Sequence, residues 1–228
     1  MSRVLHAIQL LSSWLMSGLR LGMGAWTRGN QRSGVKPLEL FDFEACPHCR
    51  LVREAVTELA LDVRVFPCPK GGERFRPVLT ERAGKAQFPY LVDPNTGEEM
   101  YESGDIVRYL FRTYGRGVPI RWWVVPLQRV GSVLASLPRP GRGMHVYASS
   151  APAQPLRLTS RESHGGARLI RERLCELELS YDLHSAGRPA GAGAHDREHV
   201  PTLHDPNTGS RLVDVQEILR YLADTYAV

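Results

Sequence analysis

The chain of 228 residues contains an internal repeat of domain size. At an offset of 118 residues, Arg-Leu-Val-Arg-Glu at 50–54 is matched by Arg-Leu-Ile-Arg-Glu at 168–172. At an offset of 112 residues, Asp-Pro-Asn-Thr-Gly occurs identically at 93–97 and 205–209. Chance does not produce such matches in the same order, so we expect two related domains.

Hydrophobic spacing predicts the same mixed α/β order in each copy: strand, helix, strand, helix, strand, strand, helix. In the first copy the clearest elements are a strand at 38–43, a helix at 50–59, a strand at 61–65, a hairpin at 90–92 and 100–101, and a helix at 104–114. In the second copy a Gly/Ala-rich loop at 187–194 replaces or shortens the second helix.

The repeat extends back into the apolar N-terminal segment, because residues 13–24 have a weaker match at 132–143. A segment duplicated in mid-chain is not a cleaved signal peptide, and charged residues interrupt the run needed to span a membrane. We interpret both segments as short amphipathic helices packed on the domains, in preference to binding at a membrane surface.

These boundaries divide the chain into four parts. Residues 1–35 form an N-terminal helix and linker, 36–115 the first domain, 116–154 a second helix and linker, and 155–228 the second domain.

Composition excludes some functions. The net charge of +5 is modest, and no basic run with interleaved aromatic residues is present, so nucleic acid is not an expected partner. Four cysteines in a chain of this length do not form a disulfide framework. A Cys-x-x-Cys pair without such a framework indicates redox or metal chemistry in a reducing compartment, and we expect a cytoplasmic protein.

Cys46-Pro47-His48-Cys49 lies between the first predicted strand and helix. The N-terminus of a helix favours a thiolate, so Cys46 is the candidate nucleophile. Pro47 suits the first helical position, and His48 adds positive charge when protonated. Cys49 lies one turn on, within reach of a mixed disulfide at Cys46. A zinc or iron–sulfur half-site is the alternative, but there is no second Cys-x-x-Cys pair, so we assign no metal.

The first copy resembles a known family. Cys46-Pro47-His48-Cys49 after a strand, Phe88-Pro89 before a hairpin and Glu102-Ser103 before the last helix resemble the thioredoxin fold in its glutaredoxin and glutathione S-transferase N-terminal form. Leu40-Phe41, the Cys-Pro-His-Cys motif and Arg53 are also similar to the glutaredoxin-like domain of type-two prostaglandin E synthases, and further stretches resemble tandem glutathione-transferase N-terminal-domain proteins of bacteria and plastids. The expected fold class is therefore α/β, with two tandem thioredoxin-like domains, each preceded by a short amphipathic helix.

The resemblance implies a glutathione site. It implies a cis peptide bond between Phe88 and Pro89, facing the nucleophile, although an ordinary trans proline at the start of a strand remains open. Ser103 at the start of a helix suits a carboxylate and Glu102 an ammonium group, and glutathione carries both on one carbon. A plain helix cap is the alternative.

Arg76, Arg82 and Lys85 are candidates for the other carboxylate of glutathione, with a solvated basic face as an equal alternative. Cys68, between two prolines, is expected to be exposed in a loop, as a glutathionylation site or a small turn residue. Cys175, on the copied helix, is interpreted as structural.

The second copy lacks the thiol chemistry. His164-Gly165-Gly166-Ala167 replaces the Cys-Pro-His-Cys motif, and Asp214-Val215 replaces Glu102-Ser103. Pro201 remains. His195 and His199 are four residues apart, with His204 nearby, but their Gly/Ala-rich setting argues against a metal site.

The favoured prediction is a glutathione-dependent thiol–disulfide oxidoreductase whose partners are glutathione and a disulfide or glutathionylated substrate. The alternatives are a non-catalytic binding or scaffold module, and a glutathione-linked iron–sulfur, haem-associated or transferase-like protein.

Overall fold

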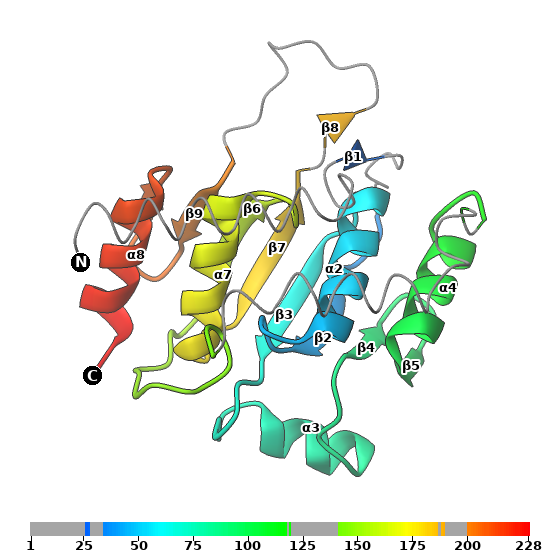
Figure 1. Cartoon of the computed structure of the whole chain (residues 1–228), viewed down its shortest axis with the longest axis horizontal. Helices are drawn as coiled ribbons and strands as arrows, with labels where there is room; N and C mark the ends of the chain where they lie inside the picture. The colour runs from blue at the N-terminus through cyan, green and yellow to red at the C-terminus, as the bar shows by residue number, and fades with distance from the viewer. Residues whose placement is uncertain (1–25, 28–33, 118, 120–140, 187, 190–199) are drawn as a thin grey trace.

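The computed structural model describes residues 26–27, 34–117, 119, 141–186, 188–189 and 200–228 (Figure 1). Most of both predicted amphipathic segments, most of the Gly/Ala-rich loop, His195 and His199 lie outside these residues. Within the described part, no helix is long and apolar enough to cross a membrane.

One eight-stranded sheet runs through the molecule in the order β10-β9-β6-β7-β3-β2-β4-β5. Its first-half strands are β2 (Leu38–Asp42), β3 (Val63–Pro67), β4 (Tyr90–Asp93) and β5 (Glu98–Tyr101). Its second-half strands are β6 (Leu156–Ser160), β7 (Tyr181–Ser185), β9 (Thr202–Asp205) and β10 (Ser210–Leu212). A separate pair joins β1 (Trp26–Thr27) and β8 (Arg188–Pro189).

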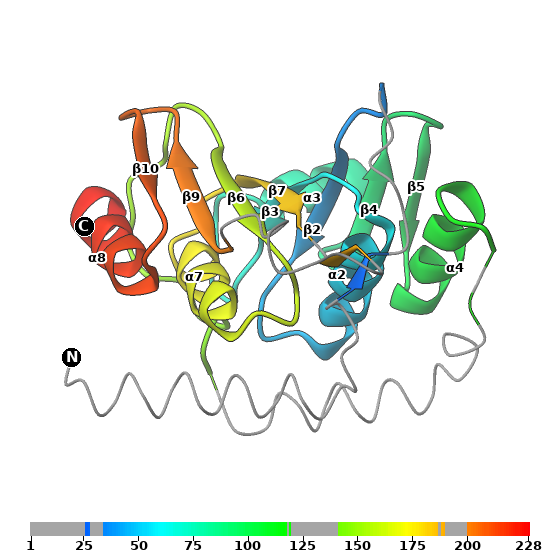
Figure 2. The same cartoon turned by 90° about the horizontal axis from the view of Figure 1, so that it is seen from above.

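The helices of the described residues are α2 (Pro47–Leu59), α3 (Arg76–Ala83) and α4 (Ser103–Thr113) in the first half, and α7 (Gly165–Glu176) and α8 (Val215–Tyr226) in the second. Both views show α2 and α7 side by side, with α4 and α8 at opposite ends of the molecule (Figures 1 and 2). In each half the first two strands are parallel and the last two form an antiparallel hairpin. The mixed α/β class predicted from the sequence is therefore observed.

The two halves meet edge to edge, because β3 pairs antiparallel with β7. Arg64 pairs with Asp182, and Asp182 is the residue that the 118-residue offset of the repeat matches to Arg64. A pseudo-twofold axis therefore passes through this pair. The guanidinium contacts the carboxylate twice, with Nε–Oδ1 at 2.7 Å and Nη2–Oδ2 at 3.0 Å. The apolar core is continuous across the junction, since buried side chains of both halves form one cluster.

The repeated Asp-Pro-Asn-Thr-Gly sequence ties each hairpin to the last helix of its half. Asp93 is fully buried and accepts hydrogen bonds from the hydroxyls of Tyr109, at 2.6 Å, and Tyr114. Gly97 closes the turn at φ +79°, a conformation that side chains disfavour. Asp205 receives the same two bonds, from Tyr221 at 2.6 Å and from Tyr226. This shared network gives a physical reason for the strongest match between the copies.

Candidate active site

Cys46 occupies the N-cap of α2, where its Sγ accepts a hydrogen bond from the backbone N–H of Cys49 at 3.4 Å. The pKa of Cys46 is lowered, first by a hydrogen bond from the Cys49 side chain and then by the backbone N–H groups of Cys49 and His48 and by the Arg53 guanidinium; burial opposes the shift. Only 5% of Cys46 is exposed. The thiol expected to be the nucleophile therefore lies in a setting that favours its thiolate form.

Cys49 has the opposite setting. Its side chain is fully buried, and burial followed by the hydrogen bond to Cys46 raises the pKa of its thiol well above the ordinary value. A low-pKa thiol beside a high-pKa thiol is the pairing that sequential attack and resolution require.

Pro47 and His48 complete the turn. Pro47 is the first residue of α2, as predicted. His48 is exposed, and its backbone N–H acts on Cys46. The positive charge that acts on Cys46 is that of Arg53. The sequence indicated Arg53 only through a family resemblance.

The Phe88-Pro89 peptide bond is cis, as the resemblance implied, and Val200-Pro201 is cis as well. The Phe88 ring meets the Phe43 ring edge to face at 5.8 Å between centroids. Phe43 lies in the short segment between β2 and Cys46. This contact therefore places the loop that carries Phe88 and Pro89, the proline loop, beside the segment that leads into the Cys-Pro-His-Cys turn.

Ser103 is the first residue of α4 and is buried, as expected for a residue that opens this helix. Glu102 precedes it at φ +67° and its side chain caps no helix N–H. Its carboxylate instead accepts a hydrogen bond from Gln87 Nε2 at 2.7 Å, so Glu102 is linked to the loop that carries Phe88.

The candidate basic residues lie in three different settings. Arg76 donates to the carbonyls of Pro69 (2.6 Å) and Cys68 (2.9 Å), and its guanidinium lies 4.8 Å from the Phe88 ring centroid. Lys85 Nζ lies 4.6 Å from the ring centroid of Tyr101.

Arg82 is engaged elsewhere, with Glu99 at 2.6 Å and Glu39 at 3.4 Å. Of the three, Arg76 therefore has the most direct contact with the proline loop.

The prediction of an exposed Cys68 is wrong. Cys68 is fully buried under the first half, and its thiol donates to the Phe66 carbonyl at 3.3 Å. Burial raises the pKa of this thiol far above its ordinary value. The flanking prolines shape a segment that packs inward, which local sequence did not reveal.

Cys175 is buried between the halves, as its structural interpretation requires. Its thiol donates to the Gly143 carbonyl at 3.3 Å, and its Sγ accepts from the Glu44 N–H at 3.5 Å.

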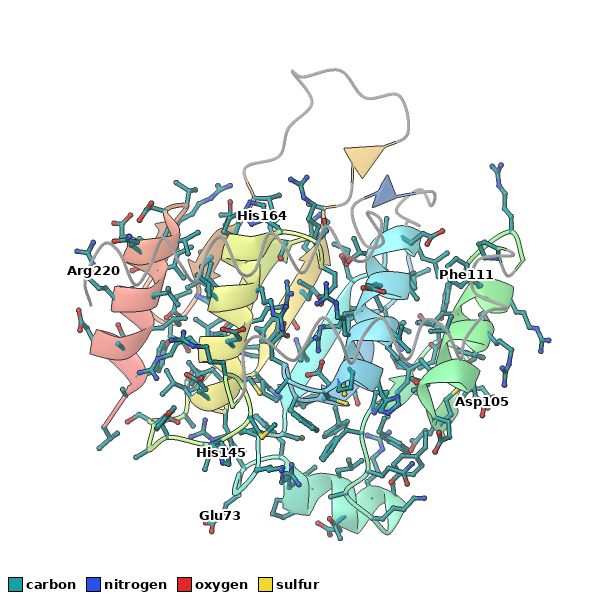
Figure 3. All side chains as sticks on the ribbon, viewed as in Figure 1. Glu73, Asp105, Phe111, His145, His164 and Arg220 are labelled. Atoms are coloured by element: carbon teal, nitrogen blue, oxygen red, sulfur yellow. The ribbon has the colours of Figure 1, made fainter. Side chains whose placement is uncertain are left out.

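The second half fills the equivalent positions with its own side chains. His164, labelled in Figure 3, takes the place of Cys46 and accepts from Ala167 N–H through Nδ1 at 3.1 Å. Burial, then Arg161 and Arg171, lowers the pKa of His164 to about 4, so the imidazole is neutral at pH 7 and its Nδ1 can act as an acceptor. A Cβ on Gly166 would lie 2.7 Å from a methyl of Val215, so Val215 closes the space over this turn.

A buried cluster of charges lies at the junction, and the sequence pattern did not predict it. Arg53 and Arg171 are each 1% exposed and contact both Glu44 and Glu162. Asp42 joins the cluster through Arg53. The repeat contained the signal, because the Arg pair and the Glu pair are each related by the offset of 118 residues.

Among the described residues, no group of three or more His, Cys, Asp and Glu side chains is arranged to hold a metal ion.

Comparison with known proteins gives one family match. Residues 40–118 match the family described as glutathione S-transferase, N-terminal domain. This segment contains Cys46, Pro89 and Ser103 and about a third of the chain. No curated protein sequence matches the chain.

Solved structures that match are glutathione transferases. A Bombyx mori enzyme, solved alone and in complex with GTT, is 28% identical over 36% of this chain and 38% of its own length, with a TM-score of 0.32. A delta-class glutathione transferase of Nilaparvata lugens is 26% identical over 35% of this chain and 37% of its own, also with a TM-score of 0.32. The matched part thus spans well under half of each of these proteins.

Proposed function

We propose that the protein is a glutathione-dependent thiol–disulfide oxidoreductase in which Cys46 is the nucleophile and Cys49 the resolving thiol. The observation that carries this proposal is the opposed setting of the two thiols. Cys46 accepts a helix N-terminal hydrogen bond and has a lowered pKa, while Cys49 is fully buried and has a raised pKa.

The reaction has two exchanges. The Cys46 thiolate attacks one sulfur of a glutathionylated substrate, the substrate thiolate leaves and takes a proton, and Cys46 is left disulfide-bonded to glutathione. A second glutathione thiolate then attacks the glutathione sulfur, which releases oxidised glutathione and restores Cys46. When glutathione is scarce, Cys49 loses its proton and attacks the Cys46 sulfur of the mixed disulfide instead, which forms the intramolecular disulfide and releases glutathione as a thiolate that takes up a proton.

The family match of residues 40–118 supports glutathione as the thiol. In the proposed complex, backbone groups beside Pro89 bind the peptide part, Ser103 at the start of α4 receives the γ-glutamyl carboxylate, and Glu102 receives the ammonium group. Arg76, beside Phe88, is the favoured partner for the second carboxylate, with Lys85 as a further candidate.

The second half supports this placement by contrast. Asp214, at the position of Glu102, caps α8 with its own carboxylate, which accepts from Gln216 N–H at 3.0 Å and Glu217 N–H at 2.9 Å. The side chain of Glu102 makes no such bond to α4. The helix end that has no side-chain cap is the one assigned to the ligand's carboxylate.

We further propose that the two halves are tandem thioredoxin-like domains, at 36–115 and 155–228, in a cytoplasmic protein. The same strand order and the same Asp–Tyr network in both halves support the assignment of tandem domains.

The test is reduction of hydroxyethyl disulfide by glutathione with the fully reduced protein. Turnover is expected for the wild type and for Cys175→Ser, and none for Cys46→Ser. Absence of turnover in folded, fully reduced wild type would refute the proposal.

A transferase-like activity is the second candidate, because the matched family is that of glutathione S-transferases. Conjugation of glutathione to chlorodinitrobenzene by a protein that does not reduce disulfides would favour it.

A further inference from the structure

The turn that leads into Cys46 is clamped by one buried guanidinium. Arg53 donates to the Asp42 carboxylate through Nη1, and through Nη2 to the Glu44 carbonyl at 3.4 Å. Asp42 ends β2 and Glu44 lies two residues before Cys46, so Arg53 holds both sides of this short segment. Arg53 is 1% exposed.

Arg53 shares a face of α2 with the two thiols. Cys46, Cys49 and Arg53 are spaced i, i+3 and i+7 on α2, which places them on one face of the helix. The Arg53 charge accordingly acts on both thiols. Arg53 thus has two roles in the site: it holds the turn in position, and its charge acts on the two sulfurs.

Arg53 is itself held by the other half of the molecule. Its Nε donates to Glu162 Oε2 at 3.1 Å, across a sequence separation of 109 residues. The burial of Glu162 would favour its neutral form, but Arg171 and then Arg53 and Arg50 bring the pKa of Glu162 down to about 2, so it is a carboxylate at neutral pH.

The arrangement is reciprocal with one exception. Arg171 donates to the Glu44 carboxylate of the first half through Nε and Nη2, both at 3.2 Å. It also donates to the Glu162 carbonyl at 3.5 Å. At the position equivalent to Asp42 stands Ser160, which Arg171 contacts at 3.3 Å. The additional carboxylate, Asp42, is present only in the half that carries the Cys-Pro-His-Cys turn. The cluster therefore departs from twofold symmetry on the side of the dithiol.

We infer that the half without the Cys-Pro-His-Cys motif is a working part of the dithiol site: Glu162 is a positioning residue that holds Arg53 against the Cys46–Cys49 turn and balances its charge. This deepens the proposed function, since it names what regulates that same site, and it rests on Cys46 being the reactive thiol.

The experiment measures the pH dependence of Cys46 alkylation by iodoacetamide in the full chain, with Cys68→Ser and Cys175→Ser as a common background. Glu162→Gln keeps an oxygen that can accept from Arg53 but removes one negative charge. The thiolate should then form more readily, and the midpoint pH of alkylation should fall by about 0.5–1 unit. The midpoint potential of the Cys46–Cys49 disulfide should become more oxidising.

Glu172→Gln is the matched control. Glu172 is a buried carboxylate of the same half, and it pairs with Arg168 at 3.4 Å. Its alkylation midpoint should equal that of the wild type, even where its melting temperature falls. A midpoint unchanged in Glu162→Gln, or shifted equally in Glu172→Gln, overturns the inference.

A second variant guards against loss of folding. Arg53→Gln combined with Glu162→Gln removes one charge of each sign from the cluster. With the cation gone, the alkylation midpoint should rise above that of the wild type, and an unchanged midpoint contradicts the inference. Alkylation needs no glutathione, so the predicted shifts in a protein that does not reduce hydroxyethyl disulfide would refute the proposed function alone.

Discussion

The two halves of the molecule share their scaffold and a cis proline, but they differ at the start of the first helix and at the start of the last helix. Each half begins its first helix with a side chain that accepts the N–H three residues on, but the acceptor is the Cys46 sulfur in one and the His164 imidazole in the other. Each half opens its last helix after a hairpin, but only Asp214 caps that helix with its own side chain. The comparison teaches that the second half caps its last helix with its own side chain, at the position where the first half is proposed to receive a ligand.

The junction gives the second half a further use. If the second half only covered apolar surface of the first, an apolar contact would suffice at the junction. Replacing buried ion pairs by apolar residues is often neutral or stabilising. The cluster of Arg53, Arg171, Glu44 and Glu162 instead links the thiol turn to the opposite half.

The strongest way to break the comparison is to remove the thiol that only the first half has. Cys46→Ser should lower glutathione-dependent disulfide reduction by at least about 100-fold, because the serine hydroxyl is neither a thiolate nor a leaving group in disulfide exchange. Cys68→Ser is the matched control, since that thiol is buried with a raised pKa. Equal loss of rate in both variants would contradict the assignment of Cys46.

The next largest effect concerns the junction. Arg171→Met should lower the free energy of unfolding by about 3–5 kcal/mol, because it leaves Glu44 and Glu162 short of a partner in a buried site. Urea denaturation measures this effect.

Arg64→Met is its control, because the Arg64–Asp182 pair also joins the halves but is partly exposed. It should cost less than about 1 kcal/mol. Similar losses from the two changes would show that burial does not distinguish these pairs.

The third prediction gives the first half the residue of the second. Ser103→Val, which copies Val215, should raise the KM for glutathione at least about tenfold, because a hydrogen bond to a charged group contributes about 1.5–3 kcal/mol. Initial rates over a range of glutathione concentrations measure it. The alkylation rate of Cys46 should not change, and a slower alkylation would point to distortion of the thiol turn instead.

The helix ends give a smaller difference. Asp214→Ala should cost about 1 kcal/mol of unfolding free energy, because two N–H groups of α8 lose their acceptor. Glu102→Ala should cost less, since the Glu102 side chain caps nothing in α4. Chemical denaturation of both variants tests the difference, and a larger cost at Glu102 would reverse it.

The last difference is a pH dependence carried by His164. Its pKa is about 4 in the folded chain against an ordinary 6.5, so the unfolded chain binds the proton first as pH falls. Stability from this group is present above pH 6.5 and is lost between about pH 6.5 and 4.

Asp42 acts in the opposite direction, because burial raises its pKa to about 6 and its contribution is lost as pH rises through that value. The difference between wild type and His164→Asn, followed by urea denaturation from pH 4 to 7, therefore isolates His164. An identical pH dependence of the unfolding free energy in the two proteins would show that His164 does not contribute to it.

Much of the fold and part of the site were predictable because local rules govern them. Periodic apolar residues placed the strands and helices, and Pro47 and Gly97 stand where fixed or positive φ angles are needed. The cis bond at Phe88-Pro89 came from a family resemblance and was confirmed. Cys68 was placed wrongly, because two flanking prolines specify a turn but not the direction in which it faces.

The amino-acid sequence alone specified the repeat, the thiol turn and the loss of that turn in the second copy, since each depends on residues close together in the chain. Only the tertiary structure decided that β3 pairs with β7, and that Glu162 thereby reaches Arg53 beside Cys46 and Cys49. Pairing of strand edges and burial of charge depend on partners more than 100 residues away, and no local pattern states which edges meet.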